Sequence, residues 1–258
     1  MIEIVNKPYS YTFKNYASKN KKILCLSGDL TSSCEVDSFR DEFPNQFVSM
    51  GMAEQNMMSF AGGLSMSGFI PFINTFGVFT YRRPYDQLLA SIAYPRRKIR
   101  IMGFLPGITT PAGMTHQAIE DISIMRTIPN MTVIETGDAT EVESICEVAD
   151  KVDGPVYCRM LRGSVPRLFD TPLKLSDIRV LNSGTDILLI TSGICTEEAL
   201  RARAALVNAG ISILHLHVHT FKPFNEEKIL DLLTNVKLGV ITMENHLVNG
   251  GLGTMISE

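Results

Sequence analysis

The feature that most constrains the fold of this chain is a repeated alternation of short apolar runs with longer helical stretches. The strand candidates of the first part are KILCLSG, FVSM, FIPFINTF, IRIMGF, MTVIE and PVYCRM. Continuous apolar runs of this length are typical of parallel strands that are buried on both faces. The stretches 53–67, 83–93, 117–128 and 140–150 between them predict helices, and Thr140 with Glu143 resembles a capping box.

A second unit follows a segment without periodicity. From residue 162 the chain collects Gly163, Pro166, Pro172 and Gly184, a composition typical of a surface linker. The runs DILLIT, ISILHLH and LGVITME then predict strands, and 196–209 and 225–233 predict helices. We therefore expect an α/β protein of two doubly wound domains with mostly parallel sheets, covering residues 1–168 and 185–258 with a linker at 169–184. Because GGLGTMISE has the pattern of a helix start, the second domain is expected to be truncated.

Composition excludes several classes of function. With 24 Lys+Arg against 27 Asp+Glu, the chain has no basic field for nucleic acid. No segment reaches the roughly 18 unbroken apolar residues of a membrane span, and the start MIEIVNKPYSYTF lacks an apolar signal region. We expect a cytoplasmic protein that binds no membrane. Five scattered cysteines without a CxxC pair predict reduced, buried thiols, with a nucleophilic cysteine as the alternative.

An acidic residue follows one of the predicted strands, in the segment GMAEQNMMSFAGGL. Glu54 falls in the first turn of the helix predicted at 53–67, directly after FVSM. A carboxylate is favourable at a helix N-terminus for electrostatic reasons alone. The carboxyl ends of parallel strands are also where open α/β sheets bind ligands. The position therefore supports a structural role and a binding role.

Aromatic and histidine residues gather in the two segments FINTFGVFTYRRPYDQ and GITTPAGMTHQAIED. The first segment holds Phe72, Phe76, Phe79, Tyr81 and Tyr85. Rings at this spacing are common in helix cores, and they also give a flat heteroaromatic cofactor a stacking surface. His116 stands where a Gly/Pro-rich loop meets a predicted helix, which favours a functional site, and histidine exchanges protons near neutral pH.

Three further histidines occur at a spacing of two. His215, His217 and His219 would share one face of a strand, as metal ligands do. No carboxylate or cysteine stands nearby at ligand spacing, so we predict a structural role and no metal site.

Taken in order, these segments resemble the C-terminal portion of transketolases, and of two-subunit bacterial transketolases especially. The motifs are GDL at Gly28, GMAEQNM around Glu54, TFGVFTYRRPYDQ, THQAIEDISIMRTIPNMTV, the RG at Arg162 and ENHLVNGGLG. The resemblance covers essentially the whole chain. It implies a pyrimidine-binding domain and a short C-terminal domain of a thiamine-diphosphate-dependent enzyme. Such an enzyme transfers a two-carbon ketol unit from a ketose to an aldose.

The resemblance also implies roles for individual residues. Glu54 matches the glutamate that hydrogen-bonds the aminopyrimidine ring of the cofactor, and Phe76 and Phe79 match aromatic residues of the pyrimidine pocket. Asp29 corresponds to an acidic residue near the cofactor cleft.

On the substrate side, His116 matches the histidine of a THQ motif near the reacting carbon, where it handles substrate protons and hydroxyls. Ser33 and Arg162 match positions that help to hold a sugar phosphate. His219, within HTFKPFN, matches a structural turn between a strand and a helix.

One family motif is missing from the sequence. Transketolases hold the cofactor diphosphate through a divalent metal such as Mg²⁺, bound by a GDG motif and a later Asn, and oxygen ligands suit this ion. This chain has GDL at Gly28 and no such pair. The resemblance therefore implies that an N-terminal partner subunit supplies the metal site, most simply in a dimer of heterodimers, and that the chain is inactive alone.

Two departures from the family concern the substrate. The loop that commonly reads GEDG has Ala112 in place of the aspartate, and Phe104 stands where a histidine is often found. Because specificity for a hydroxyl comes from pairing it, the acceptor is expected to differ from the usual aldose phosphate. The alternatives are a β-subunit of a 2-oxoacid dehydrogenase E1, a non-catalytic paralogue, and a deoxyxylulose-phosphate synthase, which normally keeps both halves in one chain.

Overall fold

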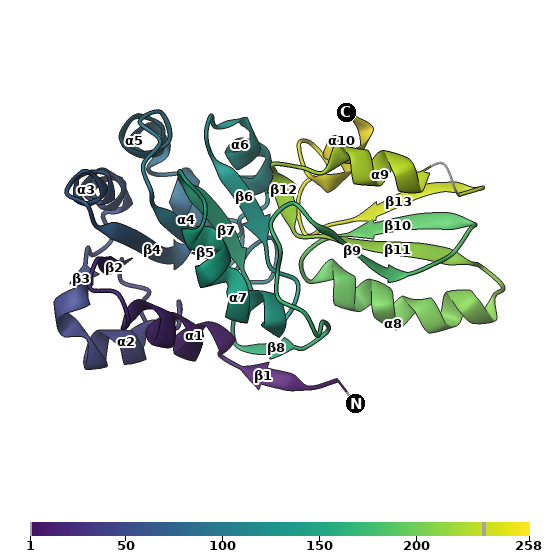
Figure 1. Ribbon diagram of the computed structural model, residues 1–258, viewed down its shortest axis with the longest axis horizontal. Helices are drawn as coiled ribbons and strands as arrows, with labels where there is room; N and C mark the ends of the chain where they lie inside the picture. Colours follow the sequence, from purple (N-terminus) through teal and green to yellow (C-terminus); the bar gives the residue numbers. More distant parts are fainter. Residues whose placement is uncertain (1, 234–235) are drawn as a thin grey trace.

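The computed structural model describes residues 2–233 and 236–258, which form two α/β domains side by side (Figure 1). The first domain comprises β1 (Ile4–Asn6), α1 (Pro8–Ala17), β2 (Ile23–Ser27), α2 (Asp37–Glu42), η1 (Pro44–Gln46), β3 (Phe47–Ser49), α3 (Glu54–Met66), β4 (Ile70–Phe76), α4 (Gly77–Tyr81), α5 (Tyr85–Gln87), η2 (Leu88–Ala93), β5 (Arg100–Phe104), α6 (Asp121–Thr127), β6 (Thr132–Glu135), α7 (Ala139–Asp150), β7 (Val156–Met160) and β8 (Ser164–Pro166). The second comprises β9 (Ile178–Asn182), β10 (Ile187–Thr191), α8 (Cys195–Asn208), β11 (Ile213–Val218), β12 (Thr220–Lys222), α9 (Glu226–Leu233), β13 (Gly239–Met243) and α10 (Leu252–Ser257).

A seven-stranded sheet organises the first domain. Its strand order is β12-β6-β7-β5-β4-β2-β3, and every neighbouring pair is parallel except β12 with β6. Helices α1, α2 and α7 cover one face, and α3, α5 and α6 cover the other (Figure 1). The predicted doubly wound fold with a mostly parallel sheet is confirmed.

Burial explains why these runs form strands. Every residue of β2, β5, β6 and β7 is buried, as expected for parallel strands covered on both faces. The same apolar core continues into the second domain, where Leu188, Leu216 and Val218 join it. The two domains therefore share one core instead of meeting at a wet interface.

The first half differs from the sequence prediction at several helices: α1 and α2 were not predicted, and the helix predicted at 83–93 is α5 followed by η2. The helix expected at 117–128 begins only at Asp121, because the preceding residues belong to a loop. The predicted capping box of Thr140 and Glu143 is wrong, since α7 is capped by Asp138, whose side chain accepts from the Glu141 backbone N–H at 2.8 Å. Thr140 instead donates to the Phe169 carbonyl at 2.6 Å.

The segment between the domains also differs from the expectation of a linker. Residues 169–184 contain β9, which pairs antiparallel with β11 and so belongs to the second sheet, of order β13-β10-β11-β9. Conversely, β12 of the second half extends the first sheet by pairing antiparallel with β6. Because each half contributes a strand at the junction, the two domains are joined by strand pairing as well as by the chain.

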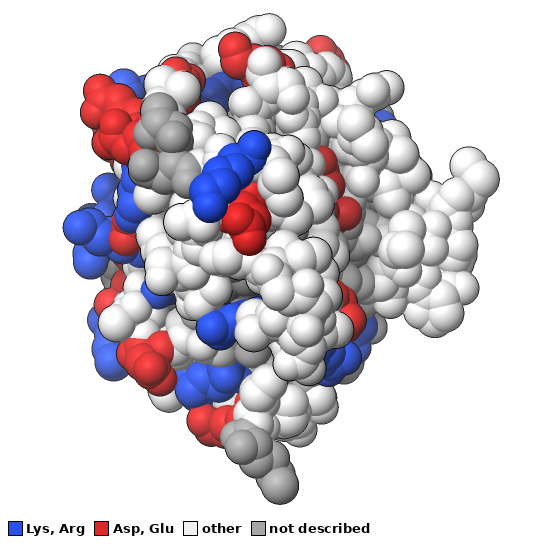
Figure 2. All heavy atoms as spheres, turned by 90° about the vertical axis from the view of Figure 1, so that its right-hand side faces the viewer, with Lys and Arg blue, Asp and Glu red and all other residues white. Residues whose placement is uncertain are grey.

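Strand β13 lies at one edge of the sheet of the second domain. Val240 and Ile241 of this strand are exposed, as is Leu238 just before it. The face of the molecule in Figure 2 shows basic and acidic side chains interspersed in a larger neutral surface. Within residues 2–233 and 236–258, no helix has the length and apolar character needed to cross a membrane.

Candidate active site

The residues singled out from the sequence gather at one edge of the seven-stranded sheet. Asp29 follows β2, Glu54 follows β3, Phe79 follows β4, His116 lies in the loop after β5, and Arg162 follows β7. Because these five strands are mutually parallel, their carboxyl ends share an edge. Ligands of open α/β sheets bind at this edge, so topology alone brings the segments together.

Glu54 is the first residue of α3 and lies at the base of a hollow. It is 4% exposed, although it carries a carboxyl group. Gly51, with a φ of 67°, makes the turn from β3 that directs the helix N-terminus toward the sheet edge. The hollow of about 560 Å³ above it is lined by Met52, Ala53, Glu54, Gln55, Asn56 and Arg83.

Arg83 is the partner of this carboxylate. Its Nη1 donates to Oε1 of Glu54 at 2.8 Å and to Oε2 at 2.9 Å. Its Cζ lies 4.3 Å from the centroid of the Phe79 ring, within range of a cation–π contact. Since the Arg83 side chain is 49% exposed, the pair is open to solvent on one side.

Phe76, Phe79 and His116 form an aromatic group beside this pair. The two phenyl rings are nearly parallel, with an interplanar angle of 11° and centroids 6.3 Å apart. The imidazole of His116 meets both rings edge-on, at 5.4 Å from Phe79 and 6.3 Å from Phe76. The arrangement is a flat apolar wall with a proton-exchanging group at its rim.

The other rings of this stretch do not belong to the wall. Phe72 and Tyr81 are buried in the core, and Tyr85 is exposed. Thus the structure separates two site aromatics from three neighbours of the same type.

His116 lies in residues 105–120, here called the His116 loop. Arg82 holds its outer part, since its Nη1 donates to the Met114 carbonyl at 2.8 Å and its Nη2 to the Gln117 carbonyl at 3.1 Å. Its Nε also donates to Oε1 of Glu120 at 2.6 Å. The Nδ1 atom of His116 contacts the Thr115 hydroxyl at 2.9 Å.

Asp29, Ser33 and Arg162 lie farther along the same edge. Asp29 is exposed, and Ser33 and Arg162 are half-buried. Near them lies the buried acid Glu35, whose Oε1 accepts from the Gly163 backbone N–H at 2.6 Å. Burial raises the pKa of Glu35, while the Gly163 hydrogen bond and the Arg162 charge act in the opposite direction.

The two residues that depart from the family pattern have different surroundings. Ala112 lies at the exposed tip of the His116 loop, and its backbone N–H donates to the Thr110 hydroxyl at 3.3 Å. Phe104 is a core residue at the end of β5, fully buried with its ring edge-on to Tyr9. The position at which a family histidine is often found is thus a core position directly before the His116 loop.

The HLHVH histidines are buried and hydrogen-bonded. His215 Nε2 contacts the Thr191 hydroxyl at 2.9 Å, and His217 contacts the Thr196 hydroxyl at 2.7 Å and Oε2 of Glu141 at 3.1 Å. His219 Nδ1 contacts the Thr220 hydroxyl at 2.9 Å. Within the described part of the chain, no group of three or more His, Cys, Asp or Glu side chains could hold a metal ion.

A larger hollow, of about 950 Å³, lies between α6, α9 and α10, away from Glu54. The cationic side chains that line it already donate hydrogen bonds to backbone carbonyls. Arg126 donates to the Gly250 carbonyl at 2.9 Å, and Lys222 donates to the carbonyls of Arg126 and Ile128 at 2.8 and 2.7 Å. We therefore place the candidate active site at Glu54.

Sequence reasoning missed two charged residues of the sheet edge. Arg83 stands in the quoted segment TFGVFTYRRPYDQ, yet nothing in its spacing indicates Glu54 as its partner. Glu35 could have been noticed as an acid inside the otherwise apolar run CEV.

Comparison with known proteins gives the geometry a family. Residues 5–167 match the family model of the transketolase pyrimidine binding domain, and residues 176–258 match that of the transketolase C-terminal domain. A 6-deoxy-6-sulfo-D-fructose transketolase subunit from Clostridium sp. (strain MSTE9) is 39% identical over 94% of this chain and 76% of its own length. One of the subunits of an apulose-4-phosphate transketolase from Phocaeicola vulgatus is 30% identical over 98% of this chain and 82% of its own length.

A solved structure agrees with this relationship. A split gene transketolase, described as an inactive beta4 tetramer, has a TM-score of 0.88 and 36% identity, and the match covers 97% of this chain and 81% of that chain. Both domains and their order are thus shared, and the chain belongs to the transketolase family.

Proposed function

We propose that the chain is the pyrimidine-binding subunit of a split transketolase, active with thiamine diphosphate and a partner subunit. It would transfer a two-carbon ketol unit from a ketose phosphate, or a similar anionic ketose, to an aldose acceptor. The observation that carries the proposal is the buried carboxylate of Glu54 beside the stacked rings of Phe76 and Phe79, with His116 at their rim.

The residues present fit one half of the cofactor. Phe79 offers a ring face for a flat aminopyrimidine, and Glu54 offers a carboxyl group that can share a proton with a ring nitrogen. When bound, thiamine diphosphate supplies the carbanion chemistry of the reaction. The surrounding apolar rings exclude water, and His116 exchanges protons with substrate hydroxyls at the rim.

The other half of the cofactor needs groups from elsewhere. A diphosphate is held through a divalent metal such as Mg²⁺ with oxygen ligands, and the described residues provide no such cluster. We infer that an N-terminal subunit with a GDG motif and a later Asn supplies it, in a dimer of heterodimers. The relatives that are named as transketolase subunits support this division.

Asp29 is proposed to lie near the cofactor cleft, and Ser33 and Arg162 to hold the anionic group of the sugar. The names of the two relatives give a sulfonated and a phosphorylated sugar, both anionic. A half-buried guanidinium such as that of Arg162 suits either group.

The test is reconstitution with an N-terminal subunit from a neighbouring reading frame, assayed with thiamine diphosphate, Mg²⁺ and a panel of ketoses and aldoses. Ketol transfer by the complex and by neither chain alone is expected. Glu54→Gln should lower turnover by about 10²- to 10⁴-fold, because proton transfer by a positioned group contributes that much. The same exchange at the exposed Glu42, which pairs with Lys14 at 2.8 Å, should change nothing.

Three outcomes would contradict the proposal. Decarboxylation of a 2-oxo acid without ketol transfer would indicate a dehydrogenase E1 subunit. Condensation of pyruvate with glyceraldehyde phosphate would indicate deoxyxylulose-phosphate synthesis. Unchanged turnover of Glu54→Gln would remove the catalytic role of this residue.

A further inference from the structure

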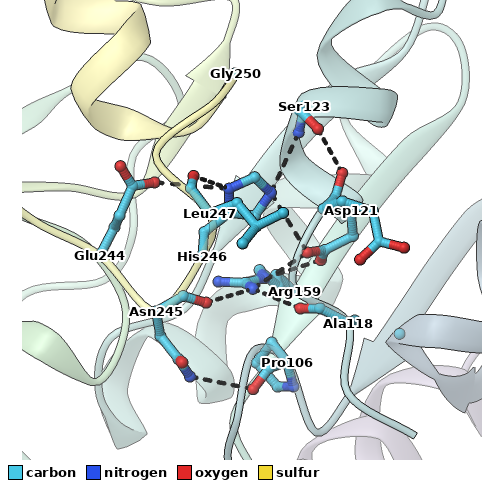
Figure 3. A network of polar contacts seen from close by, with 12 residues as sticks. Pro106, Ala118, Asp121, Ser123, Arg159, Glu244, Asn245, His246, Leu247 and Gly250 are labelled. Carbon is cyan, nitrogen blue, oxygen red and sulfur yellow. Dashed lines mark hydrogen bonds and ion pairs between the residues drawn. The ribbon is translucent and has the colours of Figure 1, made fainter. Parts of the chain in front are cut away.

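The motif ENHLVNGGLG has no part in the proposed chemistry, yet it contacts the His116 loop directly. Its first residues form a turn after β13, in the second domain, and Asn245 of this turn is buried with 8% exposure. Figure 3 shows Asn245 joined to Pro106, and Arg159 joined to both Asn245 and Ala118; Pro106 and Ala118 belong to the two ends of the loop.

The Asn245 side chain binds the outgoing end of the loop through two hydrogen bonds. Its Nδ2 donates to the Pro106 carbonyl at 3.1 Å, and its Oδ1 accepts from the Ile108 backbone N–H at 3.0 Å. A carboxamide can donate from its nitrogen and accept at its oxygen at once, as a backbone peptide does. Asn245 therefore hydrogen-bonds one backbone group on each side of Gly107.

Gly107 is fitted to this contact. A Cβ atom there would overlap three atoms of the Asn245 side chain, and the φ of Gly107 is 62°. Only a residue without a side chain allows the amide to approach so closely in this backbone conformation.

The returning end of the loop is bound by the same turn. The Leu247 backbone N–H donates to the Ile119 carbonyl at 2.9 Å. Nη2 of the buried Arg159 joins both parts, since it donates to the Ala118 carbonyl at 3.0 Å and to the Asn245 carbonyl at 2.8 Å. The loop is closed above these contacts by the Gly107 N–H, which donates to the Ala118 carbonyl at 2.7 Å.

Exposure indicates why the base of the loop matters. Met114 is 77% exposed, so little packing holds the tip. Arg82 binds the outer part of the loop, and the rings of Phe76 and Phe79 contact His116. The base of the loop is held by Arg159 of the first domain together with Asn245 and Leu247 of the second domain.

We propose that Asn245 is a positioning residue, through which the second domain sets the place of His116 relative to Glu54 and Phe79. The importance of that placement for turnover rests on the proposed function, whereas the anchoring of the loop does not. Asn245 would not touch substrate or cofactor. It would act by holding the two ends of the His116 loop in one geometry.

The first measurement is hydrogen–deuterium exchange of the isolated 258-residue chain, compared between the wild type and Asn245→Ala. Loss of the two buried hydrogen bonds should raise exchange across the His116 loop by about tenfold or more. Exchange in β2 and α3 should stay unchanged. Asn249→Ala, at an exposed position farther along the same turn, is the matched control. Equal loop exchange in Asn245→Ala and wild type would overturn the proposal.

Two further variants keep the test valid if Asn245→Ala folds poorly. Asn245→Asp retains the acceptor for Ile108 but presents no donor to Pro106, so an intermediate exchange is expected. Gly107→Ala disturbs the same contact from the loop side and should reproduce the Asn245→Ala pattern. A folded Gly107→Ala variant with wild-type loop exchange would also contradict the anchoring.

The second measurement uses the reconstituted complex. In Asn245→Ala, kcat should fall at least about tenfold, because a displacement of about 1 Å at a reacting group is costly. The affinity for thiamine diphosphate should stay within about twofold, since Glu54 and Phe79 lie on other segments. A purely structural role would lower the active fraction and leave kcat per folded complex unchanged, which would overturn the positioning role. If the wild-type complex shows no ketol transfer, the proposed function fails while the exchange result still decides the anchoring.

Discussion

The two ends of one sheet edge carry acids in contrasting environments. Near the carboxyl ends of β6 and β7, Arg159 is fully buried and pairs with Asp121 at 2.8 Å and Glu135 at 2.5 Å, under the cover of the second domain (Figure 3). Beyond β3 and β4, Glu54 is also buried, but its partner Arg83 is half exposed.

The two ends differ in whether a carboxylate can exchange its cationic partner for a ligand. Burial disfavours the charge of Arg159, yet Asp121 and Glu135 raise the pKa of its guanidinium above the ordinary value. This covered network is closed, because its carboxylates have no access to a ligand. At the open end, the Arg83 guanidinium can move away from Glu54 and remain solvated. The covered end therefore serves the fold, and the open end is available for a cofactor.

The largest expected effect is on stability at the covered end. Arg159→Ala leaves Asp121 and Glu135 buried without a cation, which should lower the free energy of unfolding by about 3 to 5 kcal/mol. Arg83→Ala, the equivalent change at the open end, should cost less than about 1 kcal/mol because its pair is partly solvated. Urea unfolding of both variants measures the contrast. Similar losses for the two would mean that cover by the second domain does not distinguish the two ends.

This contrast also explains what sequence could predict. The parallel strands were predictable because each is a continuous apolar run that is buried on both faces. Helix α1 was not predicted, although Tyr9, Phe13 and Ala17 repeat at a helical spacing on its buried face. In contrast, β9 and β12 pair with strands far away in sequence, and local composition does not encode such tertiary pairing.

The site was predictable to a similar degree. Motif order indicated Glu54, Phe79 and His116, and parallel topology accounts for their shared edge. The pairing of Arg83 with Glu54 and the contact of Asn245 with the His116 loop were not predictable. Both depend on where separate turns meet in space, and neither partner lies at a fixed spacing from the other.

The covered end should also respond to acid. Burial holds the pKa of His215 and of His219 at about 4, below the ordinary 6.5, and the nearby His217 acts in the same direction. Between these values the unfolded chain binds more protons than the folded chain, so stability must fall as pH falls from about 6.5 to about 4. The loss should reach at most about 3 kcal/mol for each histidine.

At lower pH, protonation of Glu141 determines the further loss of stability. Although burial opposes its charge, His217 and Arg179 lower its pKa to about 2, so its stabilising contribution is lost as pH falls from about 4.5 toward 2. Urea midpoints measured between about pH 7 and pH 4 test the histidine part. His215→Gln should give a shallower slope, whatever its effect at neutral pH, and a flat wild-type profile would refute this account.

The smallest expected effect is at the open end and concerns Arg83. If Glu54 and Phe79 receive the aminopyrimidine, then Arg83 holds both groups in the free subunit and must move away. Arg83→Gln removes an ion pair and a ring contact worth about 1 kcal/mol together, so thiamine diphosphate should bind the reconstituted complex about threefold to tenfold more tightly. Titration calorimetry with Mg²⁺ present measures the change.

Arg83→Lys is the informative companion variant. Lysine keeps a positive charge opposite the Glu54 carboxylate but cannot stack a planar group on the Phe79 ring. The affinity of this variant for thiamine diphosphate should therefore fall between those of the wild type and Arg83→Gln. Weaker binding by Arg83→Gln would show instead that Arg83 supports the bound cofactor. In that case the open end would be as closed a network as the covered one, and access to Glu54 would have to arise from movement of α3 relative to α4.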